Sequence, residues 1–154
     1  MEISNLVEVQ ADLFSIPDQE ALVNTVNCVG VMGKGIALEF KKRYPYMFLE
    51  YCSVCRNRHL APGGVYAHVI SEVDNPQVIY SMATKDHWRQ PSKLVWVMSG
   101  LNRLAEKLEA STIRSITMPR PGCGNGGLDW KYVRPAVVDF AKRVSFCKVT
   151  VVHQ

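Results

Sequence analysis

The chain lacks any long hydrophobic run. Apolar residues make up 47% of its 154 positions, enough for a packed core, yet no run of them approaches the roughly 18 residues of a membrane-spanning helix. The first residues also lack the basic start and apolar stretch that are typical of a secretory signal peptide. We therefore expect a cytoplasmic protein that does not contact a membrane.

The chain also lacks the cysteine pattern of a disulfide-stapled or metal-binding protein. Its five cysteines are odd in number and irregularly spaced, which argues against a disulfide framework. Cys52 and Cys55 form a single C-x-x-C, but the isolated His59, His68 and His153 do not supply a second pair of ligands. We expect packed thiols at this position, and neither a metal nor a cofactor in the protein.

Charge of one sign is not concentrated in this sequence. The net charge of +4 permits contact with a polyanion but does not by itself indicate one. The basic run Lys41-Lys42-Arg43 lies at the end of an expected helix, where cations are favoured by the helix dipole. The charge balance therefore leaves the class of partner open.

Strand-like and helix-like segments alternate along the chain. Short apolar or alternating runs predict strands, and apolar residues at three- and four-residue steps predict helices. The expected strands are residues 6–10, 21–26, 65–70, 77–82, 113–118 and 148–152, and the expected helices are residues 36–43, 45–58, 92–109 and a segment from Trp130 to beyond Ala141. This order predicts one α/β domain over residues 1–154, with helices on both faces of a sheet. The short turn between two of the strands predicts that part of the sheet is antiparallel.

The chain is organised around residues 24–45, N-T-V-N-C-V-G-V-M-G-K-G-I-A-L-E-F-K-K-R-Y-P. An expected strand passes through a loop containing Gly30, Gly33 and Gly35 into an expected helix, a geometry that offers backbone N–H groups to a phosphate. The G-x-x-G-x-G spacing matches neither the dinucleotide fingerprint nor a Walker loop. The segment is therefore either a phosphate site or an ordinary glycine-rich turn with a solvated Lys34.

Two more loops follow expected strands. One is T-K-D-H-W-R at residues 84–89, and the other is the glycine-rich segment of residues 119–127. Ligands of α/β sheets bind at the carboxyl ends of strands, so we expect all three loops to converge. Two glycine loops at one edge of a sheet fit the two sides of a diphosphate.

Several motifs agree in order and spacing with the macrodomain family over nearly the whole chain. They are Asp12 and residues 24–27, 33–37 and 121–124. The segments T-K-D-H-W at residues 84–88 and G-C-G-N-G-G-L-D-W at residues 122–130 resemble the DarG antitoxin macrodomains more closely. Those macrodomains oppose DarT DNA ADP-ribosyltransferase toxins and are similar to terminal ADP-ribose protein glycohydrolases. The resemblance implies a three-layer α/β/α fold with a mixed sheet and an ADP-ribose cleft.

The resemblance also implies the residues of an ADP-ribose site. Asp12 would accept a hydrogen bond from the adenine amino group and Leu13 would donate its backbone N–H, although the residues alone allow Asp12 to be a cap. Asn27 would contact the distal ribose, and ADP-ribose would be a ligand and product rather than a cofactor. The other implied ADP-ribose-binding residues are Gly33, Lys34, Gly35, Ile36, Ala37, Thr84, Pro121, Gly122, Cys123, Gly124, Asn125 and Gly126.

Lys85 is the residue to which the resemblance gives the catalytic role, at the anomeric carbon of the distal ribose. A lysine is a nucleophile only when its amine is neutral, so burial or a nearby cation would have to lower its pKa from about 10.4. A protonated Lys85 would instead help the leaving base depart, as an acid or electrostatic group. Without the resemblance, Lys85 would be interpreted as an exposed lysine at a strand end.

The chain departs at one position from the protein-directed glycohydrolases that it resembles. Those enzymes pair their lysine with an aspartate that would fall near Gly126, whereas Asp129 fits the N-cap of the last helix. Asn125 would help to close the loop over the ribose. His87 and Trp88 either line an exit toward a modified base, with Trp88 stacking on it, or Trp88 packs beneath its loop.

We therefore expect an ADP-ribosyl hydrolase that removes ADP-ribose from thymidine bases of single-stranded DNA and so reverses a DarT-type toxin. DNA would lie across the basic rim, and the reaction would need no metal. One alternative is a module that binds ADP-ribose without turnover, which the missing loop aspartate favours. Another is a hydrolase of ADP-ribose esters on protein or of related phosphorylated metabolites. ADP-ribosylated DNA and a DarT-type toxin are the expected partners, and the protein is expected to be a monomer.

Overall fold

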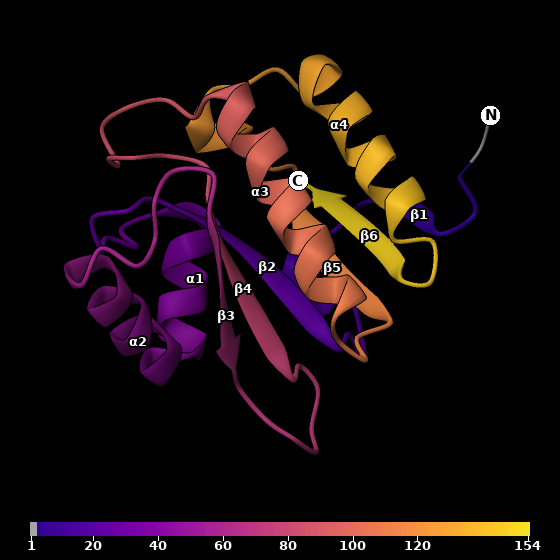
Figure 1. Cartoon of the computed structure of the whole chain (residues 1–154), viewed down its shortest axis with the longest axis horizontal. Helices are drawn as coiled ribbons and strands as arrows, with labels where there is room; N and C mark the ends of the chain where they lie inside the picture. Colours follow the sequence, from indigo (N-terminus) through magenta and orange to yellow (C-terminus); the bar gives the residue numbers. More distant parts are fainter. Residues whose placement is uncertain (1–2) are drawn as a thin grey trace.

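A computed structural model describes residues 3–154 as a six-stranded sheet between two layers of helices (Figure 1). The strands are β1 (Leu6–Gln10), β2 (Ala21–Val26), β3 (Val65–Val69), β4 (Val78–Ala83), β5 (Ser115–Pro119) and β6 (Lys148–His153). Their order is β1-β6-β5-β2-β4-β3, and every pair is parallel except β3 with β4. The predicted mixed α/β sheet and its antiparallel part are confirmed.

Two pairs of helices cover the two faces of the sheet. Helices α1 (Gly35–Arg43) and α2 (Pro45–Arg56) pack over one hydrophobic core, and α3 (Leu94–Glu109) and α4 (Trp130–Arg143) pack over the other (Figure 1). The central strands β2 and β4 are buried almost throughout, which explains their nearly continuous apolar sequences. Helix α3 buries Val97, Leu101, Leu104 and Leu108 at the predicted helical spacing.

Three element boundaries differ from the sequence prediction by two residues, and several others differ by one. The helix expected from residue 92 begins at Leu94, because Ser92 and Lys93 are used in an extended connection. The helix expected to reach residue 58 ends at Arg56, since Arg58 adopts a left-handed conformation with φ 55°. The strand expected from residue 113 begins at Ser115, because the N–H of Ile113 donates to the Ser111 hydroxyl.

The cysteines of α2 pack as predicted. Cys52 and Cys55 are unpaired thiols, partly buried against the core beneath α1 and α2. Within residues 3–154, no group of three or more His, Cys, Asp or Glu side chains is arranged to hold a metal ion. No helix in the same range has the length and apolar character needed to cross a membrane.

The parallel arrangement decides where the loops of the chain meet. Strands β1, β2, β4, β5 and β6 run in one direction, so the segments that follow their carboxyl ends lie along one edge of the sheet. These segments include both glycine loops and the loop that begins at Thr84. The predicted convergence is confirmed, and it places the candidate site at this edge.

Candidate functional site

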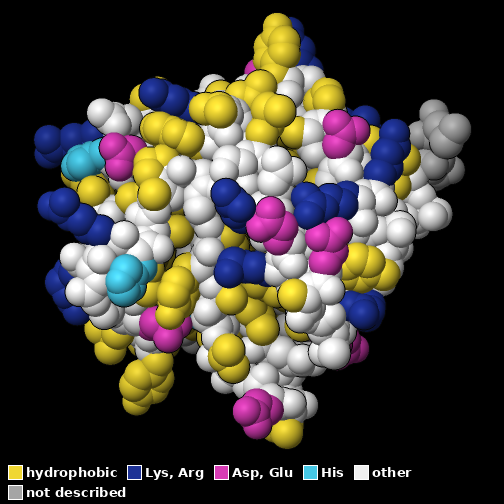
Figure 2. Space-filling view, in the orientation of Figure 1, with side chains coloured by type: hydrophobic (Ala, Val, Ile, Leu, Met, Phe, Trp, Pro, Cys, Tyr) yellow, Lys and Arg dark blue, Asp and Glu magenta, His cyan; other side chains and the backbone are white. Residues whose placement is uncertain are grey.

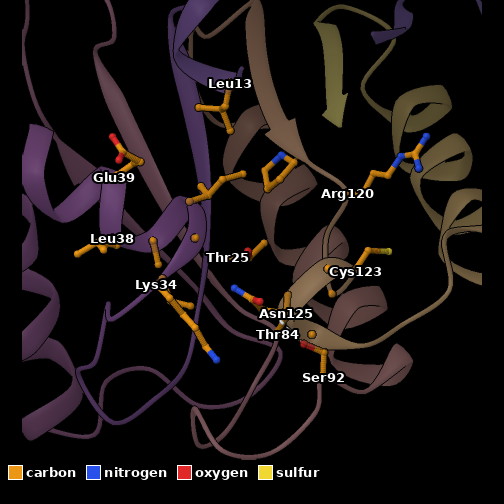
Figure 3. A pocket seen from close by; sticks show the side chains of 18 of the residues that line it. Leu13, Thr25, Lys34, Leu38, Glu39, Thr84, Ser92, Arg120, Cys123 and Asn125 are labelled. Carbon is orange, nitrogen blue, oxygen red and sulfur yellow. Dashed lines mark hydrogen bonds between the residues drawn. The ribbon is translucent and has the colours of Figure 1, made fainter. Parts of the chain in front are cut away.

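A cleft of about 1280 Å³ opens at the carboxyl ends of the parallel strands (Figure 3). Every residue that the sequence predicted for the site lines this cleft except Pro121 and His87. Pro121 is buried, and His87 is half-buried with its Nδ1 accepting a hydrogen bond from the Arg89 N–H at 3.1 Å. The predicted contacts with ADP-ribose stay predictions, but their residues are gathered around one space.

The first glycine loop, residues 27–35, is held by side chains. The buried Asn27 accepts from the N–H groups of Val29 and Val31 at 3.0 and 3.4 Å, and its Nδ2 donates to the Val31 carbonyl at 2.8 Å. The Tyr51 hydroxyl, from α2, lies 2.7 Å from the Asn27 carbonyl and 2.9 Å from Oδ1. Asn27 therefore shapes the loop, and the predicted contact with the distal ribose would have to use the second N–H of its amide.

The second glycine loop lies in the connection between β5 and α4, residues 120–129. This connection is held mainly by its own backbone. The N–H of Cys123 donates to the Arg120 carbonyl at 3.2 Å, and the N–H of Leu128 donates to the Gly122 carbonyl at 3.0 Å. Gly122 has φ +78°, and a Cβ there would lie 2.7 Å from Leu128 Cδ1, so glycine is required. Asp129 accepts from the N–H of Lys131 at 3.0 Å, which confirms its predicted capping role.

The two glycine loops touch across the cleft. Asn125 extends from the second loop toward the first (Figure 3), and a Cβ on Gly35 would lie 2.8 Å from its Nδ2. Because Gly35 has φ +62°, a side chain there would be strained as well as crowded. The predicted role of Asn125 in closing the loop over a ribose stays a prediction, but its side chain bridges the two walls.

Ser92 connects the second glycine loop to the segment that carries Lys85. Its N–H donates to the Gly126 carbonyl at 2.9 Å, and its hydroxyl lies 3.3 Å from that of Thr84. Both hydroxyl side chains are almost completely buried. Sequence reasoning missed Ser92, because its partner lies far along the chain and a serine before a helix is usually interpreted as a cap.

Lys85 lies two residues beyond the end of β4 and lines the cleft. Its N–H donates to the Val26 carbonyl at 3.3 Å, and the next carbonyl, of Asp86, accepts from the N–H of Cys28 at 3.0 Å. The pKa of Lys85 lies below its ordinary value, mainly because the side chain is partly buried and secondly because the charge of Lys34 is close. Both effects that a nucleophilic lysine requires are therefore present, and they increase its neutral fraction at a given pH.

Asp12 and Leu13 line the end of the cleft beside β1. The Oδ1 atom of Asp12 accepts from the N–H of Phe14 at 2.9 Å and caps the short 3-10 turn Leu13–Ser15. The capping alternative is thus observed. The other carboxylate oxygen remains able to accept from an amino group, so the cap and the predicted adenine contact are compatible.

Sequence reasoning missed two polar residues of this cleft, Arg120 and His153. The Arg120 guanidinium stacks 4.8 Å from the centre of the Trp130 ring. Among residues 3–154, Arg120 Nε and His153 Nδ1 are buried without a hydrogen-bond partner. Buried polar atoms normally have partners, so the lack of partners distinguishes these two atoms among the residues that line the cleft. Their positions at or just beyond the carboxyl ends of β5 and β6 could have indicated them.

Trp88 lies at the mouth of the cleft. Its side chain is 40% exposed, and the Arg89 guanidinium stacks 4.6 Å from the centre of its ring. The His87 ring lies 5.4 Å from it on the same loop. This exposure fits the predicted exit position better than packing beneath the loop, while contact with a base stays a prediction.

Comparisons with known proteins agree with this geometry. The Macro domain model matches residues 23–137. The chain is 48% identical over 121 residues to the DNA ADP-ribosyl glycohydrolase of Mycobacterium tuberculosis. The matched region covers 79% of this chain and 34% of that protein. The chain therefore spans about a third of the length of this curated relative.

Solved structures give the same picture. The macrodomain of Mycobacterium tuberculosis DarG superposes with a TM-score of 0.92 at 40% identity, covering 97% of each chain. Thermosipho africanus DarTG in complex with ADP-ribose superposes with a TM-score of 0.87 at 29% identity, covering 97% of this chain and 41% of that one.

Proposed function

Because the chain belongs to the Macro domain family, we propose that its cleft binds ADP-ribose and that the protein removes ADP-ribose from thymidine bases of single-stranded DNA. The observation that carries the proposal is Lys85, partly buried in a cleft between two glycine loops. A similar protein named DNA ADP-ribosyl glycohydrolase and the similar DarG macrodomain support this choice of substrate.

The two glycine loops suit the diphosphate of ADP-ribose. Their backbone N–H groups can approach phosphate oxygens closely where glycine leaves no Cβ in the way. The volume of about 1280 Å³ exceeds the roughly 300–1,000 Å³ of ordinary small-molecule pockets. The surplus leaves room for the modified base beyond the distal ribose.

Lys85 acts at the anomeric carbon of that ribose. As a neutral amine it forms a nitrogen–carbon bond while the carbon–base bond breaks, the base leaves with the electron pair and takes up a proton, and water later releases ADP-ribose. As a protonated amine it gives its proton to the departing base while water attacks the same carbon. The lowered pKa of Lys85 is compatible with both courses, because it increases the neutral fraction and also eases release of the proton.

A DarT-type toxin is the proposed functional partner, because its product would be this enzyme's substrate. The likeness to Thermosipho africanus DarTG supports this pairing. Binding without turnover, which the missing loop aspartate favours, and hydrolysis of protein esters are the competing functions.

Single-turnover release of ADP-ribose from thymidine-modified single-stranded DNA tests the proposal. We expect release by the native protein and a loss of at least a hundredfold in Lys85→Ala, with ADP-ribose affinity largely retained. Lys142→Ala, at an exposed lysine in the last turn of α4, is the matched control and should behave as the native protein. Binding of ADP-ribose without release from DNA would contradict the proposal, and modified protein assayed in parallel identifies an ester hydrolase.

A further inference from the structure

The segment of residues 88–96, which leads from the cleft into α3, carries two aromatic rings that are each covered by a cation. The Arg89 guanidinium lies 4.6 Å from the centre of the Trp88 ring, and Lys93 Nζ lies 4.8 Å from the centre of the Trp96 ring. Arg89 and Lys93 are exposed, Trp88 is 40% exposed and Trp96 is half-buried. We call these four residues the aromatic–cation ledge.

The cations of the ledge have no acidic partner. Within residues 3–154, no carboxylate oxygen lies within 4.0 Å of Arg89 or Lys93, and the same holds for Lys34 and Lys85 in the cleft. Figure 2 shows Lys and Arg gathered along the edge of the molecule over α1, α2 and the loop before α3, with few acidic side chains between them. The positive charge along this edge can therefore attract an external anion.

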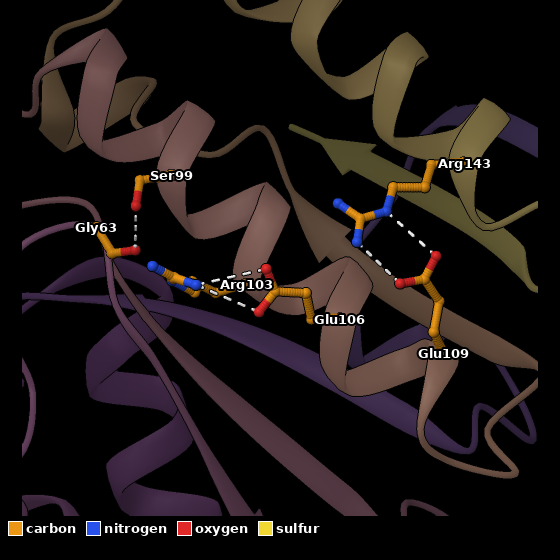
Figure 4. A network of polar contacts seen from close by, with 6 residues as sticks. All are labelled: Gly63, Ser99, Arg103, Glu106, Glu109 and Arg143. Atoms are coloured by element: carbon orange, nitrogen blue, oxygen red, sulfur yellow. Dashed lines mark hydrogen bonds and ion pairs between the residues drawn. The ribbon is translucent and has the colours of Figure 1, made fainter.

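The face formed by α3 and α4 provides the contrast. Arg103 pairs with Glu106 at 3.3 Å, and Arg143 pairs with Glu109 at 2.8 Å (Figure 4). Basic and acidic side chains alternate over this face in Figure 2. These two arginines are therefore neutralised by neighbouring carboxylates, whereas, within residues 3–154, Arg89 and Lys93 are not.

The ledge leads directly away from the reacting position. Lys85 and Trp88 both line the cleft, and Ser92 holds the far end of their loop against the second glycine loop. In the proposed reaction, the modified base is attached to the ribose beside Lys85. Residues 87–96 therefore offer a path along which the DNA strand on one side of that base can leave the cleft.

We propose that the aromatic–cation ledge binds the nucleotides that flank the modified thymidine in single-stranded DNA, an inference that rests on the proposed function. A base stacks on the exposed part of Trp88, and Arg89 and Lys93 contact the adjoining phosphates, with Trp96 holding Lys93 in position. Stacking on a protein ring requires an unpaired base, so the ledge selects single strands over duplex.

The double variant Arg89→Ala/Lys93→Ala separates this inference from the proposed function. The substrates are ADP-ribosylated thymidine as a free nucleoside and the same nucleoside within a single-stranded oligonucleotide. We expect kcat/KM for the oligonucleotide to fall at least tenfold, through KM, and hydrolysis of the nucleoside to be retained. Two lost phosphate contacts should also reduce the slope of log affinity against log salt by about 1.4.

The matched control is Arg103→Ala/Arg143→Ala, which removes two exposed but paired cations from the α3–α4 face and should leave both substrates unaffected. Unchanged oligonucleotide kinetics in the ledge variant, or an equal loss in the control, would overturn the ledge. Native protein that hydrolyses neither substrate would instead overturn the proposed function. Native protein that prefers the annealed duplex would overturn the selection for single strands.

Discussion

The two glycine loops occupy equivalent positions, each between a buried parallel strand and a helix. Different interactions hold their backbones in place. In the first loop, the Asn27 amide and the Tyr51 hydroxyl fix the backbone, and a Cβ added to Gly33 would meet only Val31, at 3.6 Å. In the second, Gly122 fits against Val97 and Leu128 because it has no side chain. Similar glycine-rich sequences therefore depend on different residues.

The largest expected effect is at Gly122 in the second loop. Gly122→Ala would place a Cβ 2.7 Å from Leu128 Cδ1 and 2.8 Å from Val97 Cγ2 at φ +78°. Overpacking and left-handed strain together should lower the free energy of unfolding by about 3 kcal/mol, measured by urea denaturation. At Gly124, φ is +63° and nothing would lie within 4 Å of an added Cβ. Gly124→Ala should therefore lower the free energy of unfolding by only about 1 kcal/mol. Equal losses would show that packing does not distinguish the two positions.

Tyr51→Phe tests the first loop, which we expect to depend on side chains. The variant removes the hydroxyl that lies 2.7 Å from the Asn27 carbonyl and leaves buried acceptors without that donor. The free energy of unfolding should fall by about 1–2 kcal/mol, and ADP-ribose affinity should fall with it. Tyr46→Phe, on the same helix at 86% exposure, should change stability by less than about 0.5 kcal/mol. Native stability and affinity in Tyr51→Phe would show that the loop keeps its conformation without the Tyr51 hydroxyl.

Gly33→Ala separates ligand approach from folding. The position is not left-handed, and the new Cβ would meet only Val31 at 3.6 Å, so stability should stay within about 0.5 kcal/mol of the native protein. If phosphate oxygens approach this backbone, the Kd for ADP-ribose measured by calorimetry should rise about tenfold, or about 1.4 kcal/mol. Unchanged affinity would move the phosphate contact elsewhere in the loop.

The smallest expected effect concerns Lys34, the cation that the first loop places near Lys85. Lys34→Gln removes a positive charge that lowers the pKa of Lys85, so that pKa should rise. If neutral Lys85 acts, single-turnover rates rise with pH through this pKa, and the rise should move to higher pH in the variant. If protonated Lys85 acts, rates fall with pH instead, and that fall moves the same way. A profile that matches Lys142→Gln would contradict the coupling.

The sequence predicts most of the fold because its strands and helices have strong local patterns. It also predicts the site residues at strand ends, and the macrodomain resemblance adds their roles. It does not predict Ser92, because the hydrogen bond to Gly126 joins residues far apart in the chain. It also does not predict the hydrogen bonds that Asn27 makes within its loop, because the Tyr51 hydroxyl that joins them comes from α2 and not from the adjoining α1. Arg120 and His153 can be recognised as residues of one site only when the ends of β5 and β6 are known to lie side by side.

The pairing of β1 with β6 has a consequence for the order in which the protein is made. Strand β1 pairs with β6 alone, and Asn5 donates to the carbonyls of Ala141, Val144 and Cys147. During translation, β1 therefore has no partner strand until β6 has been made. Because Asp12 follows β1, the end of the cleft that carries Asp12 is assembled after the end that carries Lys85. A nascent chain therefore contains Lys85 before the cleft around it is complete.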